Sequence, residues 1–265
     1  MATGDLPALP PSLRAERDGA VLVVTLARPA KRNALDDDTV LGLAGLFRSL
    51  PEDVGAVVLA GEGDHFCAGL DLSMLRERDV TEGMHHSRMW HAAFHEIEFG
   101  RVPVVAALKG AVIGGGLELA AAAHIRVAER STFYALPEGQ RGIYTGGGAS
   151  VRLPRLVGMA RMRDMMMTGR TYDAEAGMAA GFSQYVVGDG EGLAKAKELA
   201  AKAAGNAPLT NFALIHVLPR IADADPAVGY VAEALMAAVA QGDAEAKRRL
   251  ADFLEKRAGK VSPRG

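Results

Sequence analysis

VPVVAALKGAVIGGGLELAAAAH, residues 102–124, contains an apolar run, then three consecutive glycines, and then a second apolar run. The first run, 102–108, has the length of a buried strand, and 114–123 has that of a helix entered through a glycine turn. Lys109 and Glu118 interrupt the stretch, so the pieces between charges are too short to cross a bilayer. The stretch therefore predicts a buried strand, a turn and a buried helix.

Strand patterns recur on both sides of this stretch, and helical patterns separate them. Two strands joined by Asp18-Gly19, a pair typical of a hairpin turn, are expected at 13–17 and 21–26. Further strands are expected at 55–61, 125–128, 132–134 and 185–187. Helices are expected over 37–50, 72–99, 149–157, 160–167, 173–180, 191–205, 208–221, 226–241 and 243–257, with a loop at 137–148. This alternation predicts an α/β fold with a largely parallel sheet.

The order of these elements divides the chain into three parts. We expect an α/β catalytic core over 13–190 and a helical C-terminal region over 191–265. Residues 1–12, which are rich in proline, are expected to form a loose N-terminal arm. The helical region carries apolar side chains such as Phe212 and Leu235 that a few helices cannot bury alone. It is therefore expected to pack on the core or on another subunit.

The composition is that of a globular protein. The chain has 265 residues, of which 49% are hydrophobic and 23% charged, with a formal net charge of −2. Because the charge is near zero and no stripe of basic and aromatic residues is visible, we expect no nucleic-acid partner. The single cysteine, Cys67, excludes an intrachain disulfide and a cysteine-rich zinc site. The sequence shows neither a secretory signal nor a membrane span, so we expect a cytoplasmic protein without a membrane partner.

Three short segments carry groups suited to chemistry. In 65–71 (HFCAGLD) and 114–116 (GGG), glycines let the backbone turn so that amides can point at a developing negative charge. The second of these has neither the dinucleotide-binding nor the Walker A spacing. Glu118 and Glu138 follow at the starts of later elements, and in a shared cleft repulsion and burial would push their pKa values apart. Taken singly, 65–71 can also be a strand-to-helix turn capped by Asp71, and each glutamate an ordinary acid at a helix start.

Other polar and sulfur-containing residues have simpler interpretations. Cys67 has no visible base partner and is interpreted as a small buried side chain. His91 and His95 have the i, i+4 spacing that can hold a metal, but no H-E-x-x-H pattern accompanies them. We therefore expect no metal site.

Together the motifs resemble the enoyl-CoA hydratase/isomerase (crotonase) superfamily across about residues 13–257. The resemblance rests on RPAKRNAL at 28–35, on 65–71, 110–118 and 136–142, on RLPRLVG at 152–158 and on LADFLEKR at 250–257. It implies ββα turns wound as a spiral, and a helical C-terminal region that mediates homotrimers, which can pair into hexamers. It also implies a coenzyme A thioester as the substrate, with no separate cofactor.

The resemblance further implies roles for particular residues. The backbone amides of Ala68 and Gly115 would form an oxyanion hole for the thioester carbonyl, a kind of donor whose loss lowers rates about 10²–10³-fold. Glu118 and Glu138 would hold the water that adds across the C2–C3 double bond, with Glu138 as proton donor to C2 and Glu118 as the water-orienting base. The residues expected to bind substrate are Lys31, Ala68, Gly69, Leu70, Asp71, Gly114 and Gly115, with Arg32 beside Lys31 near the nucleotide.

The expected activity is that of an enoyl-CoA hydratase. Two alternatives stay open, a Δ3-Δ2 enoyl-CoA isomerase, which needs mainly one proton shuttle, and an acyl-CoA binding protein without turnover. The sequence departs from the hydratase pattern at Thr145, where proline is usual, and at Gln140 and Arg141, where apolar residues are usual. Tyr144 is also large for a residue of the acyl pocket, so the acyl preference stays open. Gly146 stands where dienoyl-CoA isomerases carry an acid, which argues against that branch.

Overall fold

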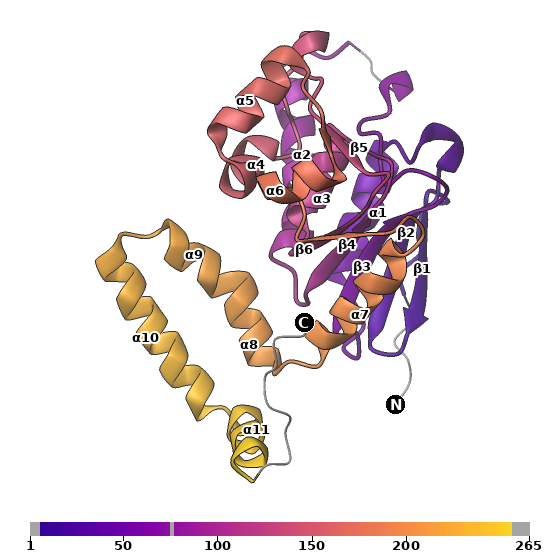
Figure 1. Ribbon diagram of the computed structural model, residues 1–265. Helices are drawn as coiled ribbons and strands as arrows, with labels where there is room; N and C mark the ends of the chain where they lie inside the picture. The colour runs from indigo at the N-terminus through magenta and orange to yellow at the C-terminus, as the bar shows by residue number, and fades with distance from the viewer. Residues whose placement is uncertain (1–5, 75–76, 256–265) are drawn as a thin grey trace. The chain divides into compact units, whose positions relative to one another are not determined.

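The chain forms two compact units, residues 1–204 and 205–265, and a computed structural model describes residues 6–74 and 77–255. The first unit is built on a six-stranded sheet in the order β1-β2-β3-β4-β6-β9 (Figure 1). Its strands are β1 (Leu13–Asp18), β2 (Val21–Leu26), β3 (Ala56–Gly61), β4 (Val104–Leu108), β6 (Ile125–Glu129) and β9 (Tyr185–Val187). The β1–β2 hairpin is antiparallel and the remaining neighbours are parallel. The expected α/β fold with a largely parallel sheet is confirmed.

A second, smaller sheet completes a repeating ββα arrangement. It contains β5 (Ala111–Ile113), β7 (Phe133–Ala135) and β8 (Tyr172–Asp173), and Cys67 joins it by a parallel bridge to Val112. The order of long strand, short strand and helix occurs in β4, β5 and α3 (Gly115–Ala122), and again in β6, β7 and α4 (Ala149–Val157). The same order holds for β3, the Cys67 bridge and α2 (Val80–Glu98). This confirms the expected ββα repeat, although β5 and β8 were not expected as strands.

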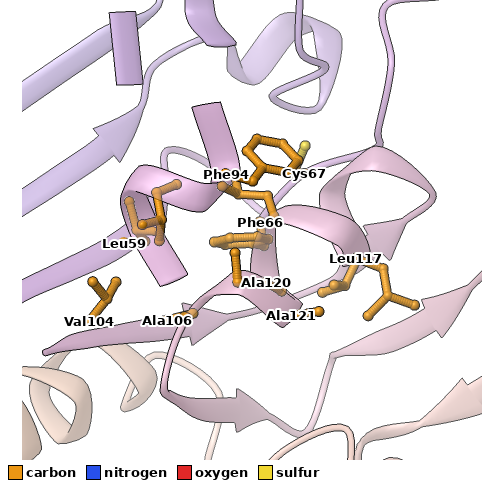
Figure 2. Packing of buried hydrophobic residues seen from close by; sticks show 14 of the residues in the cluster. Leu59, Phe66, Cys67, Phe94, Val104, Ala106, Leu117, Ala120 and Ala121 are labelled. Atoms are coloured by element: carbon orange, nitrogen blue, oxygen red, sulfur yellow. The ribbon is translucent and has the colours of Figure 1, made fainter. Parts of the chain in front are cut away.

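Alternating side chains of the large sheet pack into two separate cores. Leu22, Leu59 and Ala106 belong to the core that includes residues of α1 (Asp37–Arg48), α2 and α3. Val23 and Val58, on the opposite face, pack with α7 (Gly192–Ala204). Figure 2 shows Phe66 and Phe94 in the first core, together with Leu59, Val104, Ala120 and Ala121. Because both faces of the sheet are covered at its centre, β2, β3 and β4 are nearly continuous apolar runs.

The placement of α7 sets the division between the two units. This helix packs on β3 and β4 and belongs to the first unit. The structure therefore divides the chain after Ala204, one helix later than the expected boundary between 190 and 191. The first unit also contains α5 (Met159–Thr168) and α6 (Ala174–Ala180).

Two expectations about the first unit were wrong in detail. The helix expected over 72–99 begins only at Val80, where Asp79 and Glu82 form a reciprocal capping box, and Leu72–Met74 is a separate 3₁₀ turn. The arm expected to be loose is packed where it is described: Leu6 and Leu9 contact the first core. Residues 1–5 of that arm lie outside the described residues.

The second unit is helical, as expected. It contains α8 (Pro208–Phe212), a π-helical segment Ala213–Val217, α9 (Leu218–Asp223), α10 (Pro226–Gly242) and α11 (Ala244–Leu254). Many of its large apolar side chains are exposed, among them Phe212, Leu214, Leu218, Tyr230, Val231, Leu235, Val239, Leu250, Phe253 and Leu254. Across residues 6–74 and 77–255, no helix combines the length and the apolar character needed to span a bilayer.

Candidate active site

A cavity of about 380 Å³ in the first unit brings together the segments that carry the candidate groups. Leu70 comes from the loop after β3, Gly115 and Glu118 from the start of α3, and Glu138 from the loop after β7. The remaining wall is formed by α2 and by the glycine-rich loop before α4. The full lining is Leu70, Arg78, Gly83, His86, Ser87, Trp90, Gly115, Glu118, Glu138, Ile143, Tyr144, Thr145, Gly146 and Gly147.

The amide expected from Ala68 is already used, so that assignment was wrong. The Ala68 N–H donates to the carbonyl oxygen of Arg32 at 2.9 Å. Leu70 instead forms a parallel bridge with Leu35, in which the flanking groups make the bonds: Leu35 N–H donates to the Gly69 oxygen, and Asp71 N–H donates to the Leu35 oxygen. This geometry turns the Leu70 N–H away from Leu35, and within the described residues it has no acceptor.

The Leu70 and Gly115 amides lie side by side at the mouth of α3. A Cβ on Gly115 would stand 3.4 Å from the Leu70 nitrogen, and a Cβ on Gly69 would stand 3.2 Å from the Gly115 nitrogen. Gly115 begins α3, so its N–H has no partner within the helix, and the positive end of the helix dipole faces the same point. The pair can therefore donate two hydrogen bonds to one oxygen that gains negative charge.

Glu118 is buried in α3 and held at one oxygen by the glycine-rich loop. Its Oε1 accepts from the Gly147 amide at 2.8 Å and from the Ala149 amide at 3.0 Å. Burial raises the pKa of Glu118, and these amide hydrogen bonds oppose that shift. The carboxyl group is thereby fixed in orientation beside the cavity.

Glu138 also lines the cavity, at the start of the 3₁₀ turn Gly139–Arg141. It is only 7% exposed, and its Oε2 has no hydrogen-bond partner in the described part of the chain. Burial raises the pKa of Glu138 to about 7, and the negative charge of Glu118 adds to this shift. One carboxyl group of the pair can therefore carry a proton near neutral pH while the other acts as a base.

Lys31 and Asp71, two of the residues expected to bind substrate, form an ion pair with each other. Lys31 Nζ lies 3.3 Å from Asp71 Oδ2 and donates to Ser73 Oγ at 2.8 Å. Arg28 Nη2 donates to Asp71 at 2.7 Å. Hydrogen bonds from Ser73, and then from Arg28, hold the pKa of Asp71 well below its usual range. This cluster joins the 28–35 loop to the 65–71 loop, which presents the Leu70 amide. Asp71 accepts from Ser73 N–H as a cap, the simpler of its two interpretations.

The departures from the hydratase pattern lie at different distances from the cavity. Tyr144 and Thr145 line it, whereas Gln140 and Arg141 are exposed and do not. Gln140 Nε2 donates to the Thr168 oxygen at 3.2 Å. The side chain of Gln140 therefore faces the end of α5 and not the cavity.

Cys67 and His95, which were also considered from the sequence, are packed against other parts of the protein. Burial raises the pKa of the Cys67 thiol to about 12, so this side chain is a buried thiol, as interpreted from the sequence. The His95 ring packs against Phe99 in a tilted arrangement, with the ring centroids 4.8 Å apart. Within residues 6–74 and 77–255, no group of three or more His, Cys, Asp or Glu side chains is arranged to bind a metal.

Sequence reasoning missed two residues that shape the site. Asn33 is buried in the left-handed region (φ 57°), and its amide group donates to the Glu62 and His65 oxygens. Asparagine tolerates this conformation, which was the available signal. Trp90 packs its ring against Gly115, where a Cβ would come within 2.9 Å of the indole. Both residues fix the backbone around the two amides.

Comparison with known proteins gives a consistent result. The profile of the enoyl-CoA hydratase/isomerase family matches residues 16–262. A short-chain-enoyl-CoA hydratase of Clostridium acetobutylicum is 33% identical over 247 residues, which cover 91% of this chain and 94% of that protein. Enoyl-CoA hydratase EchA19 of Mycobacterium tuberculosis is 32% identical over 77% of this chain and 79% of its own length. A solved structure from Rhodopseudomonas palustris, provisionally named an enoyl-CoA hydratase, is 56% identical. It covers 97% of this chain and 100% of its own, with a TM-score of 0.92.

Proposed function

The chain belongs to the enoyl-CoA hydratase/isomerase family, and we propose that it is an enoyl-CoA hydratase, a hydro-lyase acting on 2-enoyl-CoA thioesters. The observation that carries this proposal is the presence of two buried carboxyl groups, Glu118 and Glu138, on one cavity beside the Leu70 and Gly115 amides. Hydration requires an oxyanion site and two proton-handling groups, and this cavity supplies both. A double-bond isomerase needs mainly one such group.

The proposed reaction begins at the thioester carbonyl. Its oxygen accepts hydrogen bonds from Leu70 N–H and Gly115 N–H, which stabilise the enolate as it forms. Glu118, as the ionised group, takes a proton from water while the water oxygen bonds to C3 and the C2–C3 electron pair moves toward the carbonyl. Glu138, which carries a proton near neutral pH because of its raised pKa, delivers it to C2. Proton exchange through the pair, which titrates as one unit, restores the starting state.

The test is a hydration assay on purified protein with a panel of C4 to C16 enoyl-CoA thioesters. We expect loss of the absorbance of the conjugated enoyl group, and at least a 10³-fold fall in kcat for Glu118→Gln and for Glu138→Gln. Full activity in both variants would contradict the two-carboxylate mechanism. Deuterium at C2 without oxygen added at C3 would support the isomerase alternative. Tight acyl-CoA binding in calorimetry without any product would support a binding protein.

We also propose that the helical unit joins copies of the chain into a homotrimer, or a dimer of trimers. The support is the set of apolar side chains on α9, α10 and α11 that these helices do not bury among themselves. Sedimentation equilibrium should give a mass of three or six chains. Replacing Leu235 and Val239 by glutamate should shift that mass to one chain.

A further inference from the structure

The glycine-rich loop before α4, which orients Glu118, accepts hydrogen bonds from side chains at its carbonyl groups. The Gly147 N–H that donates to Glu118 belongs to the same peptide unit as the Gly146 carbonyl, and that carbonyl accepts from Ser87 Oγ at 2.7 Å. The next carbonyl, of Gly147, accepts from Arg152 Nη1 at 2.9 Å. The N–H side of this loop therefore faces Glu118, and its C=O side faces side chains of α2 and α4.

Three neighbours fix the position of the Arg152 side chain: Glu98, the Gly147 carbonyl group and Gly148. Its side chain is only 8% exposed, and its Nε lies 2.6 Å from Glu98 Oε2 at the end of α2. Gly148 leaves the room that the guanidinium occupies, because a Cβ there would lie 2.2 Å from Nη1. Gly148 also has a φ of +107°, a conformation that glycine adopts without strain. A buried arginine paired with one carboxylate and one carbonyl is fixed in both position and charge.

We propose that Arg152, anchored by Glu98, is a positioning residue for the reaction: it holds the Gly147–Ala149 amides against Glu118 and keeps a buried positive charge behind them. This inference rests on the proposed function, since it deepens the role of Glu118 as the base. Arg152 does not line the cavity and acts through the loop and through its charge. Neither role was expected from the sequence, in which Arg152 is only part of the RLPRLVG motif.

The electrostatic part of this role has a definite sign. The charge of Arg152 lowers the pKa of Glu118, against the larger effect of burial. The other titratable or charged groups near Glu118 and Arg152 are Glu138, Arg141 beyond it, Arg78 and His86 on the cavity wall, Glu98, and His91, whose pKa is lowered by burial and then by Arg152 and Arg88. Removing Arg152 should therefore raise the pKa of Glu118, and removing the charge of Glu98 should lower it.

The experiment compares four variants by the pH dependence of kcat and kcat/KM for enoyl-CoA hydration. Arg152→Met should lower kcat on the order of 10²-fold with little change in KM, because a displacement of the base of about 1 Å has effects of that size. It should also move the acid limb of the profile to higher pH. Arg152→Lys keeps the charge but not the two-directional hydrogen bonding, so kcat should fall while the limb stays in place. Glu98→Gln should move the limb to lower pH.

The matched control is Arg161→Met, the same change at an exposed arginine of α5 that donates to the Val157 oxygen. It should leave both kcat and the limb unchanged. If Arg152→Met does not fold, as judged by circular dichroism, Arg152→Lys and Glu98→Gln carry the same test. Shifts in opposite directions for the two ends of the ion pair would not arise from a general loss of stability.

The inference is overturned if folded Arg152→Met keeps kcat within threefold of the unmodified protein, or if no variant moves the acid limb. A separate readout keeps this outcome distinct from failure of the proposed function. Carboxyl-carbon NMR of Glu118, assigned with Glu118→Gln, follows the protonation of this group without any turnover. If the protein hydrates no thioester, the proposed function fails. A titration of Glu118 that is the same with and without Arg152 would then reject the positioning role as well.

Discussion

Substitution of Gly116 by alanine should disrupt the paired amides without removing any side chain that could take part in the chemistry. Gly116 lies on α3, and a Cβ at this position would stand 2.3 Å from the Cys67 carbonyl oxygen. This is about 1 Å inside the 3.4 Å at which ordinary contact begins. Because the opposing atom is backbone in the Cys67–Val112 bridge, the strain can be relieved only by moving α3 away from the 65–71 loop.

That movement separates the Gly115 amide from the Leu70 amide by a comparable distance. Losing one donor of an oxyanion site corresponds to about 10²–10³ in kcat, or about 2.7–4 kcal/mol of transition-state stabilisation. Overpacking should also lower the free energy of unfolding by about 1–3 kcal/mol. We therefore expect Gly116→Ala to fold and bind acyl-CoA but to hydrate enoyl-CoA at least 100-fold more slowly.

The assay is steady-state hydration of a C4 enoyl-CoA, with urea unfolding of the same samples. Gly45→Ala is the matched control, because within the described structure a Cβ on this α1 glycine meets nothing within 4 Å. It should keep full activity and gain up to about 1 kcal/mol of stability from helix propensity. A kcat for Gly116→Ala within threefold of the unmodified protein would refute the assignment of the oxyanion site to this junction.

Three further measurements test other features of the first unit. Because the pKa of Glu138 is raised to about 7, the folded protein keeps a proton that the unfolded chain releases, and stability falls as pH rises from about 4.5 to 7; Glu138→Gln removes this loss. The variant should therefore gain about 3 kcal/mol relative to the unmodified protein between pH 4 and pH 8 in urea unfolding, and an equal difference at both pH values would contradict the burial of this carboxyl group. Cys67 is fully buried with its thiol pKa raised to about 12, so it should resist iodoacetamide at pH 8 until urea unfolds the chain; rapid labelling of folded protein would be inconsistent with its position. Phe66→Ala should lower the free energy of unfolding by about 3–5 kcal/mol, because the ring is fully buried, and a loss below 1 kcal/mol would show that the core around it is misplaced.

The long elements were predictable because their apolar patterns are long enough to be read. The runs that became β3 and β4 and the glycine-headed helix α3 were all expected near their observed bounds. The short strands β5 and β8 were not, since three and two residues are too few for a periodic pattern. The start of α2 was misplaced even though Asp79 and Glu82 carry a readable capping signal.

The choice between the Ala68 and Leu70 amides could not be made from local sequence. Ala68 precedes Gly69 and Leu70 follows it, so both belong to the same motif. What separates them is pairing with residues of the 28–35 loop: the Arg32 oxygen accepts from the Ala68 N–H, whereas the bridge to Leu35 turns the Leu70 N–H away from that loop. Likewise, the convergence of Glu118 and Glu138 depends on the stacking of successive ββα units, which neither motif contains by itself.

A crystal structure with a saturated acyl-CoA, which cannot be hydrated, tests the proposed chemistry most directly. We expect the thioester oxygen within about 3 Å of both the Leu70 and the Gly115 nitrogen, with C2 and C3 facing Glu118 and Glu138 from the same side. A thioester oxygen bound elsewhere, or the two carboxyl groups on opposite faces of the acyl group, would contradict the hydratase mechanism.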